Sequence, residues 1–172
     1  MLFMGIARGL LSVLLIVAAI WDIRRRRVPN VLSGPILLTG IVVAAIDEGV
    51  RGAFSALLAS VLVIVLVWFP WLKGRLGGGD VKLMAAAASW VGMSFLVEYL
   101  LATALAGGVV SLVCYFLSSA SARRDMHTNL SLAVAGVVPE PPLRGENGRV
   151  SVPYSVAAAA AALVVVLLRR GW

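Results

Sequence analysis

The chain has 172 residues and a formal net charge of +7; 61% of its residues are hydrophobic and only 13% are charged. A water-soluble fold of this length could not cover so much apolar surface, because a short chain leaves a large fraction of its residues exposed. The composition excludes a soluble globular enzyme and predicts an integral membrane protein. The basic residues gather at the ends of apolar stretches, which indicates membrane topology and not a nucleic-acid-binding surface.

Six apolar stretches come close to the roughly 20 residues that a helix needs to cross a bilayer. In chain order they are residues 2–21, 31–46, 52–72, 81–98, 100–119 and 152–169. We therefore expect an all-α bundle of about six transmembrane helices, forming a single domain over residues 1–172. We expect the one long connection, at about 120–151, to be a cytosolic loop whose segment 129–138 lies at the interface or re-enters the membrane.

Lysine and arginine residues orient this bundle. Eleven of the fifteen fall on one side, namely Arg24 to Arg27, Lys73, Arg75, Lys82, Arg123, Arg124, Arg144 and Arg149; the other side holds Arg8, Arg51, Arg169 and Arg170. Basic connections face the cytosol. We therefore expect a multi-pass protein of the cytoplasmic (inner) membrane, with both termini outside.

Two aspartates lie where this topology puts helix ends on the cytosolic side. Asp22 ends the first span just before four arginines, and Asp80 opens the fourth span after Gly77-Gly78-Gly79. Ionisable residues at membrane depth are costly and are functional candidates for that reason. Asp47, Glu48 and Glu98 fall near the opposite face, where we expect solvated turn and interface residues.

Each aspartate also has a plainer interpretation. Asp80 could be a helix N-cap, and Asp22 could be a helix-end residue paired with the arginines. However, an acid at the C-terminal end of a helix opposes the helix dipole. The glycines of 77–79 exceed what a cap needs; they permit positive φ and allow another backbone to come close. We therefore expect the two carboxylates to form one site at the cytosolic face.

The residues around both aspartates resemble the motifs of the type IV prepilin peptidases, membrane aspartic proteases named for a Gly-x-Gly-Asp sequence. Gly77, Gly79 and Asp80 match that motif. Asp22, followed by Arg27-Val28-Pro29-Asn30, resembles the other motif in residues and spacing. The resemblance covers most of the chain, from about residue 10 to 168.

A third, weaker family element lies at the start of the last span. Pro153 and Tyr154 resemble it, although Ser155 stands where glycine is expected.

Three further residues belong to the predicted site. Pro29 is expected to set the turn into the second span by fixing φ, and Asn30 to cap that span. Lys82 either marks the cytosolic face or pairs with a carboxylate of the substrate. The single cysteine, Cys114, and the single histidine, His127, do not suggest a metal site, and we expect neither metal nor cofactor.

The resemblance implies an aspartic endopeptidase. Its substrate would be a small pilin-like precursor with a basic leader in the cytosol and an apolar helix in the membrane, cut at their junction. Longer family members also carry a cytosolic domain with paired cysteines and methylate the new N-terminus. This chain is similar to the short peptidases of Flp-type tight-adherence pili, which predicts cleavage without N-methylation. The expected partners are the precursor and the bilayer, with no nucleic acid; the oligomeric state is open.

The implied chemistry needs one proton on the pair, because two nearby carboxylates cannot both ionise cheaply. The N-terminus of the fourth span favours negative charge on Asp80, but the two roles exchange during turnover. Other functions stay open. A small transporter or a secretion-assembly subunit would use the pair as an ion or proton pathway, and a related protease would cut preflagellin or an intramembrane substrate.

Overall fold

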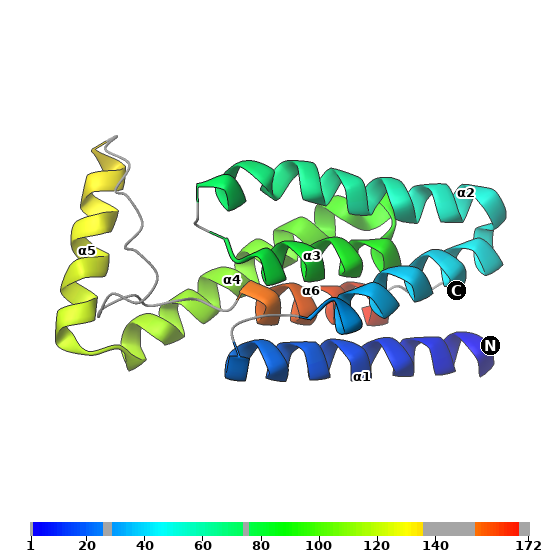
Figure 1. The fold of residues 1–172 in the computed structure, drawn as a ribbon, viewed down its shortest axis with the longest axis horizontal. Coiled ribbons are helices and arrows are strands. Elements are labelled where there is room, and N and C mark those ends of the chain that lie inside the picture. The colour runs from blue at the N-terminus through cyan, green and yellow to red at the C-terminus, as the bar shows by residue number, and fades with distance from the viewer. Residues whose placement is uncertain (1, 26–28, 74–75, 136–153, 169–172) are drawn as a thin grey trace.

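A computed structural model describes residues 2–25, 29–73, 76–135 and 154–168, which form helices and turns without any strand. Figure 1 shows most of the helices running side by side in a bundle. The elements are α1 (Leu2–Arg25), α2 (Asn30–Leu72), α3 (Gly78–Val91), the short 3-10 helix η1 (Met93–Phe95), α4 (Leu96–Leu117), α5 (Ala120–Val134) and α6 (Tyr154–Leu168). The predicted all-α fold is confirmed.

The long helix α2 folds back on itself at Gly49, which adopts φ +66°. Glycine reaches this conformation without a steric penalty. Gly52 then packs so tightly that an added Cβ would lie 2.1 Å from the carbonyl oxygen of Ala44. The two limbs correspond to the predicted spans 31–46 and 52–72. The turn lies at the same end of the bundle as the start of α1 and the end of α6 (Figure 1), and Asp47 and Glu48 are exposed beside it.

The fourth predicted span, 81–98, is wrong at its end. Helix α3 stops at Val91 because Gly92 adopts φ +70° and turns the chain. The N–H of Met93 donates to Ser55 Oγ at 2.9 Å, which fixes the new direction. A short turn of η1 follows, and Glu98 lies in the first turn of α4.

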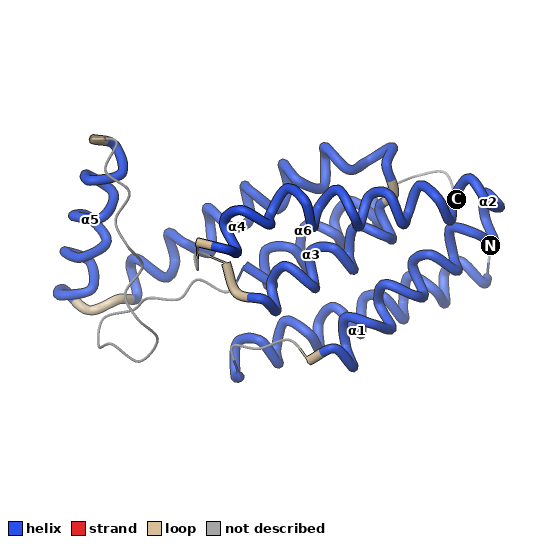
Figure 2. Tube along the Cα trace, turned by 45° about the horizontal axis from the view of Figure 1, so that its top comes forward, coloured by secondary structure: helices blue, strands red, loops and turns tan. Residues whose placement is uncertain are grey.

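The predicted connection at 120–151 contains a helix in its first part, α5 (Ala120–Val134), which the sequence does not predict. The cytosolic location of the connection stays a prediction. The sequence of α5 contains no glycine or proline, so nothing in it opposes a helix strongly. Figures 1 and 2 show α5 beyond the end of the bundle, running across the direction of the other helices. Residues 136–151 lie outside the described part of the chain.

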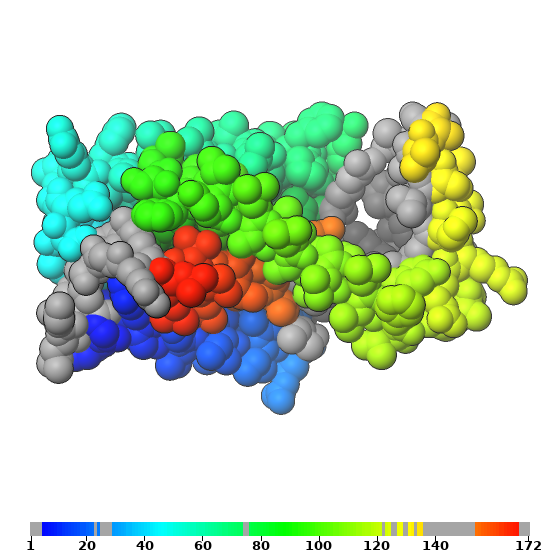
Figure 3. Space-filling model, turned by 180° about the vertical axis from the view of Figure 1, so that it is seen from behind, coloured from blue at the N-terminus to red at the C-terminus, as the bar shows by residue number. Residues whose placement is uncertain are grey.

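Helices α3 and α6 form the centre of the bundle. Helix α3 packs against α2, α4 and α6, and α6 packs against α1, α3 and α4. Figure 3 shows α6 seated between α1 and α4. Every residue from Leu83 to Val91 is buried, and five alanines of α6 are buried with them. Small side chains let membrane helices approach closely, so these alanines bring α6 near its neighbours.

Two side-chain hydrogen bonds join α3 to the first limb of α2. Trp90 Nε1 donates to the carbonyl of Ile36 at 2.8 Å, and Ser89 Oγ shares its proton between the carbonyls of Leu37 at 3.2 Å and Ala86 of its own helix at 2.7 Å. The limb can come this close because position 40 is glycine. An added Cβ there would lie 2.1 Å from Ser89 Oγ.

The outer faces of the bundle are apolar. Val31, Leu105 and Leu117 are 79%, 74% and 82% exposed. Apolar exposure on this scale marks a surface that meets lipid or another protein. Among the described residues, Gly5–Asp22, Asn30–Leu72 and Met93–Leu117 are long and apolar enough to cross a membrane, and α6 is apolar but shorter. The protein is a helical membrane protein, and six crossings stays a prediction.

We expect Gly40→Ala to lower the free energy of unfolding by about 1–3 kcal/mol, because the new methyl group overpacks the α2–α3 contact. Gly108→Ala is the control, on the exposed face of α4, where an added Cβ meets nothing within 4 Å. That change should leave stability equal or slightly higher. Thermal unfolding in detergent measures both, and equal midpoints would contradict the close approach at Gly40.

Candidate active site

Asp22 lies at the end of the buried face of α1. That face consists of Ala7, Leu11, Leu15 and Ala18, spaced three or four residues apart. Asp22 continues the spacing and is 6% exposed, so its carboxylate points into the bundle and not toward solvent. Its burial argues against the plainer interpretation of a solvated helix end.

Asp80 is the third residue of α3 and is 9% exposed. It is not the N-cap, because the helix begins at Gly78 and Gly77 holds the cap position. Asp80 Oδ2 accepts a hydrogen bond from the N–H of Gly77 at 3.2 Å, as an acid at this position does in a capping box. The carboxylate therefore sits at the N-terminus of α3, where the helix dipole favours negative charge.

Ser155 of α6 connects the two aspartates. Its N–H donates to Asp80 Oδ1 at 2.8 Å, and its hydroxyl donates to Asp22 Oδ2. Ser155 is completely buried. Carboxylates from α1 and α3 thus meet at one residue of α6, in the interior of the bundle.

Ser155 is not among the site residues that the sequence predicts, where it stands only as a departure from an expected glycine. The pattern of α6 held a usable signal. Ser155 begins a buried series that continues with Ala158, Ala162 and Val166 at helical spacing. A polar residue that opens such a series beside a predicted carboxylate pair is a candidate partner for that pair.

The glycines before Asp80 do not adopt positive φ, and Gly77 matters because it has no side chain. Gly77 has φ −70°, and Gly78 and Gly79 lie inside α3, so the expectation of positive φ is wrong. An added Cβ at Gly77 would lie 2.9 Å from Asp80 Oδ2, whereas at Gly78 the nearest atom is Trp71 Nε1 at 3.5 Å. Gly77 therefore leaves room for the carboxylate. A special role for Gly79, which is half-buried, stays a prediction.

Lys82 and Asn30 contact each other. Lys82 Nζ donates to Asn30 Oδ1 at 2.8 Å, on the exposed surface. The expected cap by Asn30 is wrong, because Pro29 holds the N-cap position of α2 and no side chain caps it. Pro29 does sit at the turn, where its carbonyl accepts the N–H of Leu32 at 3.0 Å. The Lys82–Asn30 bond joins α2 and α3 near the start of each helix.

Tyr154 begins α6 and packs against α4. An added Cβ at Gly107 would lie 3.2 Å from Tyr154 Cε1, so the ring covers this glycine. The contact fixes the first turn of α6, which contains Ser155. Pro153 lies outside the described residues.

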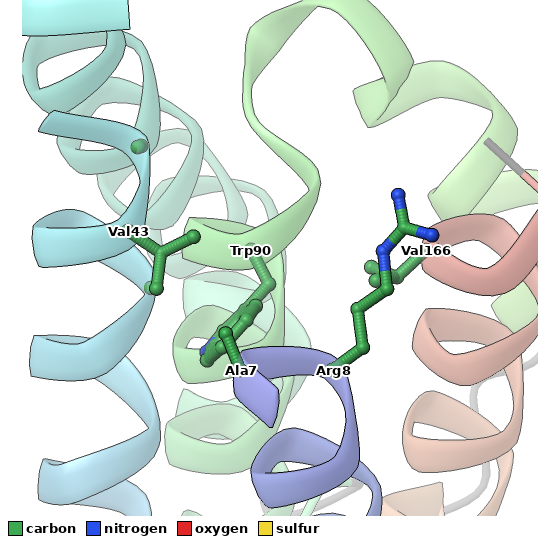
Figure 4. Close-up of a pocket in the computed structure, with 7 residues that line it drawn as sticks. Ala7, Arg8, Val43, Trp90 and Val166 are labelled. Atoms are coloured by element: carbon green, nitrogen blue, oxygen red, sulfur yellow. The ribbon is translucent and has the colours of Figure 1, made fainter. Parts of the chain in front are cut away.

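A cavity at the other end of the bundle is separate from the aspartates. Figure 4 shows Arg8 of α1, Val43 of α2, Trp90 of α3 and Val166 of α6 around it. Its full lining is Ala7, Arg8, Gly40, Val43, Ala44, Trp90 and Val166. None of these residues contributes to the cluster of Asp22, Asp80 and Ser155.

Comparison with known proteins places this arrangement in a family. The model of the type IV leader peptidase family matches residues 9–112, which include both aspartates and the glycines before Asp80. The chain belongs to the type IV leader peptidase family. The match ends before α6, so it does not include Ser155.

The chain is also similar to curated proteins named prepilin leader peptidase/N-methyltransferase. The protein of Xanthomonas campestris pv. campestris is 28% identical over 141 residues, covering 78% of this chain and 49% of the relative. That of Pectobacterium carotovorum subsp. carotovorum is 31% identical over 134 residues, covering 74% and 48%. That of Burkholderia pseudomallei is 34% identical over 118 residues, covering 62% and 36%. The chain thus matches half or less of these relatives' length, and no solved structure matches it.

The hydrogen bonds predict different stabilities for two isosteric variants. Asp22→Asn should change the free energy of unfolding by less than about 1 kcal/mol, because an amide still bonds the Ser155 hydroxyl. Asp80→Asn should cost roughly 1–3 kcal/mol, because one amide oxygen cannot accept both N–H groups that now bond two carboxylate oxygens. Thermal unfolding in detergent compares them, and a larger loss for Asp22→Asn would contradict this geometry.

Proposed function

We propose that this chain is a membrane aspartic endopeptidase that removes the basic leader from type IV pilin-like precursors, with Asp22 and Asp80 as its catalytic pair. The observation that carries the proposal is the hydrogen bonding of Ser155 to both carboxylates in one buried site. Family membership supports peptidase chemistry, and the names of the relatives support prepilins as the substrate class.

The mechanism needs one carboxylate and one carboxylic acid. The carboxylate takes a proton from a water molecule while the water oxygen attacks the scissile carbonyl carbon. The acid gives its proton to the carbonyl oxygen, which produces a neutral tetrahedral diol. One hydroxyl of the diol then gives a proton to the member that protonated the carbonyl oxygen. The leaving nitrogen takes the proton that the other member received from water, and the C–N bond breaks. The pair ends with one proton, as it began.

The hydrogen bonds support Asp80 as the carboxylate that activates water. Both of its oxygens accept backbone N–H groups, one from Gly77 and one from Ser155. Such donors favour the ionised form of a carboxylate. Asp22 instead faces a hydroxyl, which can bond an acid as well as a carboxylate. Burial of Asp80 and the nearby Asp22 carboxylate oppose its ionisation, so either acid can hold the shared proton before attack, and the two roles exchange during turnover.

Aromatic residues support a site at a boundary between the membrane and water. Trp21, Trp68 and Trp71 are 43%, 51% and 38% exposed, and they lie near the ends of α1 and α2 at which the aspartates are found. Tryptophan gathers at membrane interfaces. Lys73 Nζ lies 4.3 Å from the centre of the Phe69 ring at the same level. A precursor would present the junction of its basic leader and apolar helix at this depth.

The finer substrate assignment is an Flp-type precursor, cleaved without N-methylation. It rests on the resemblance of the sequence to the short tight-adherence peptidases. The mass of the mature product decides the second part. An unmodified N-terminus supports the proposal, and an added methyl group contradicts it.

We expect Asp22→Asn and Asp80→Asn each to lower the cleavage rate by at least roughly 10²–10⁴-fold, because each removes one member of the acid–base pair. Co-expression with a tagged cognate precursor and a gel-mobility assay, normalised to folded protein, measures this loss. Asp47→Asn is the control, because Asp47 is exposed at the opposite end. Normal processing by either site variant would remove the pair from the mechanism.

The proposed location in the inner membrane predicts a labelling pattern. Single cysteines replace the exposed residues Arg24, Val50, Lys73 and Thr128 in a Cys114→Ala background. A membrane-impermeant thiol reagent added to intact cells should label position 50 alone, because the basic ends face the cytosol. Labelling of position 24 or 73 from outside would contradict a cytosolic active site.

A further inference from the structure

Ser155 uses its hydroxyl differently from Ser60, a buried serine in the middle of a helix. Ser60, which is 3% exposed, donates to the carbonyl of Ala56 in its own helix at 3.0 Å. Ser155 is the second residue of α6, so its helix offers no carbonyl four residues earlier. Its hydroxyl instead reaches Asp22 on α1, while its N–H holds Asp80 on α3.

We propose that Ser155 is a positioning residue that keeps Asp22 aligned with Asp80 throughout the reaction cycle. This inference rests on the proposed function and adds a role for a residue of α6. Ser155 is 0% exposed, so it is placed to act on the two carboxylates and not on the substrate.

The chemistry of the two Ser155 groups suits the two aspartates. A hydroxyl can donate to a carboxylate or accept from a carboxylic acid, whereas a backbone N–H can only donate. The Ser155 hydroxyl therefore keeps its bond to Asp22 as the shared proton arrives and leaves. The N–H fixes one oxygen of Asp80 through the same steps, and the N–H of Gly77 fixes the other.

Loss of the hydroxyl should affect the chemical step and leave substrate binding unchanged. Without it, the Asp22 carboxyl group can rotate away from the position that faces Asp80. Misplacement of a reacting group by about 1 Å can cost roughly 10²-fold in rate. We therefore expect Ser155→Ala to lower kcat by roughly 10- to 100-fold while KM stays within about twofold, the pattern of an interaction that acts in the transition state.

The test uses purified full-length protein in lipid vesicles and a cognate precursor as substrate. Ser155→Ala removes the hydroxyl and keeps the N–H, Ser155→Thr keeps both, and Ser60→Ala is the matched control for loss of a buried hydroxyl. For each variant, kcat, KM and the midpoint of thermal unfolding are measured. Ser155→Thr should recover most of the lost kcat, and Ser60→Ala should match the wild type.

The inference is overturned if Ser155→Ala keeps the wild-type kcat, if KM rises in step with the loss, or if folded Ser155→Thr is as slow as Ser155→Ala. It is also overturned if the unfolding midpoint of Ser155→Ala falls more than about 4 °C below that of Ser60→Ala, a shift that indicates a structural role. Failure of the proposed function looks different. In that case the wild-type protein itself does not cleave the precursor.

Discussion

The site depends on one residue that hydrogen-bonds two acids from different helices. Two buried carboxylates repel each other and lose hydration, so such a pair needs compensating hydrogen bonds. Ser155 supplies one bond to each acid, and Gly77 supplies a further bond to Asp80. The acids are therefore held by groups from α6 and from the start of α3, which ties the site to the packing of three helices.

That packing is set by the buried faces of the helices. The buried series of α1 ends at Asp22, that of α3 begins at Asp80, and that of α6 begins at Ser155. In each helix the polar residue occupies the place where the next apolar residue would have been. Small residues allow the helices to approach, as the buried alanines of α6 show. Asp22, Asp80 and Ser155 then meet at one end of the bundle without any departure from regular helix geometry.

Glycine contributes to this fold in two distinct ways. Gly49 and Gly92 adopt positive φ and reverse or redirect the chain away from the site. Gly40 and Gly77 keep ordinary helical or extended geometry and serve by the absence of a side chain, the first beside Ser89 and the second beside Asp80. The reversals let successive helices run in opposite directions, and the close approaches let them touch.

The sequence by itself determined the helical membrane class and pointed to Asp22 and Asp80 as candidate site residues, because hydrophobic content and acids at helix ends are local properties. It misplaced the end of the fourth span, because Gly92 is one of many glycines. It did not predict helix α5 within the connection 120–151, because α5 is too polar to look like a span. It also left Ser155 out of the site. Only the tertiary structure showed that Ser155 belongs to the site. Its partners lie far away in the chain, on α1 and α3, and they meet it only when the buried faces of three helices pack together.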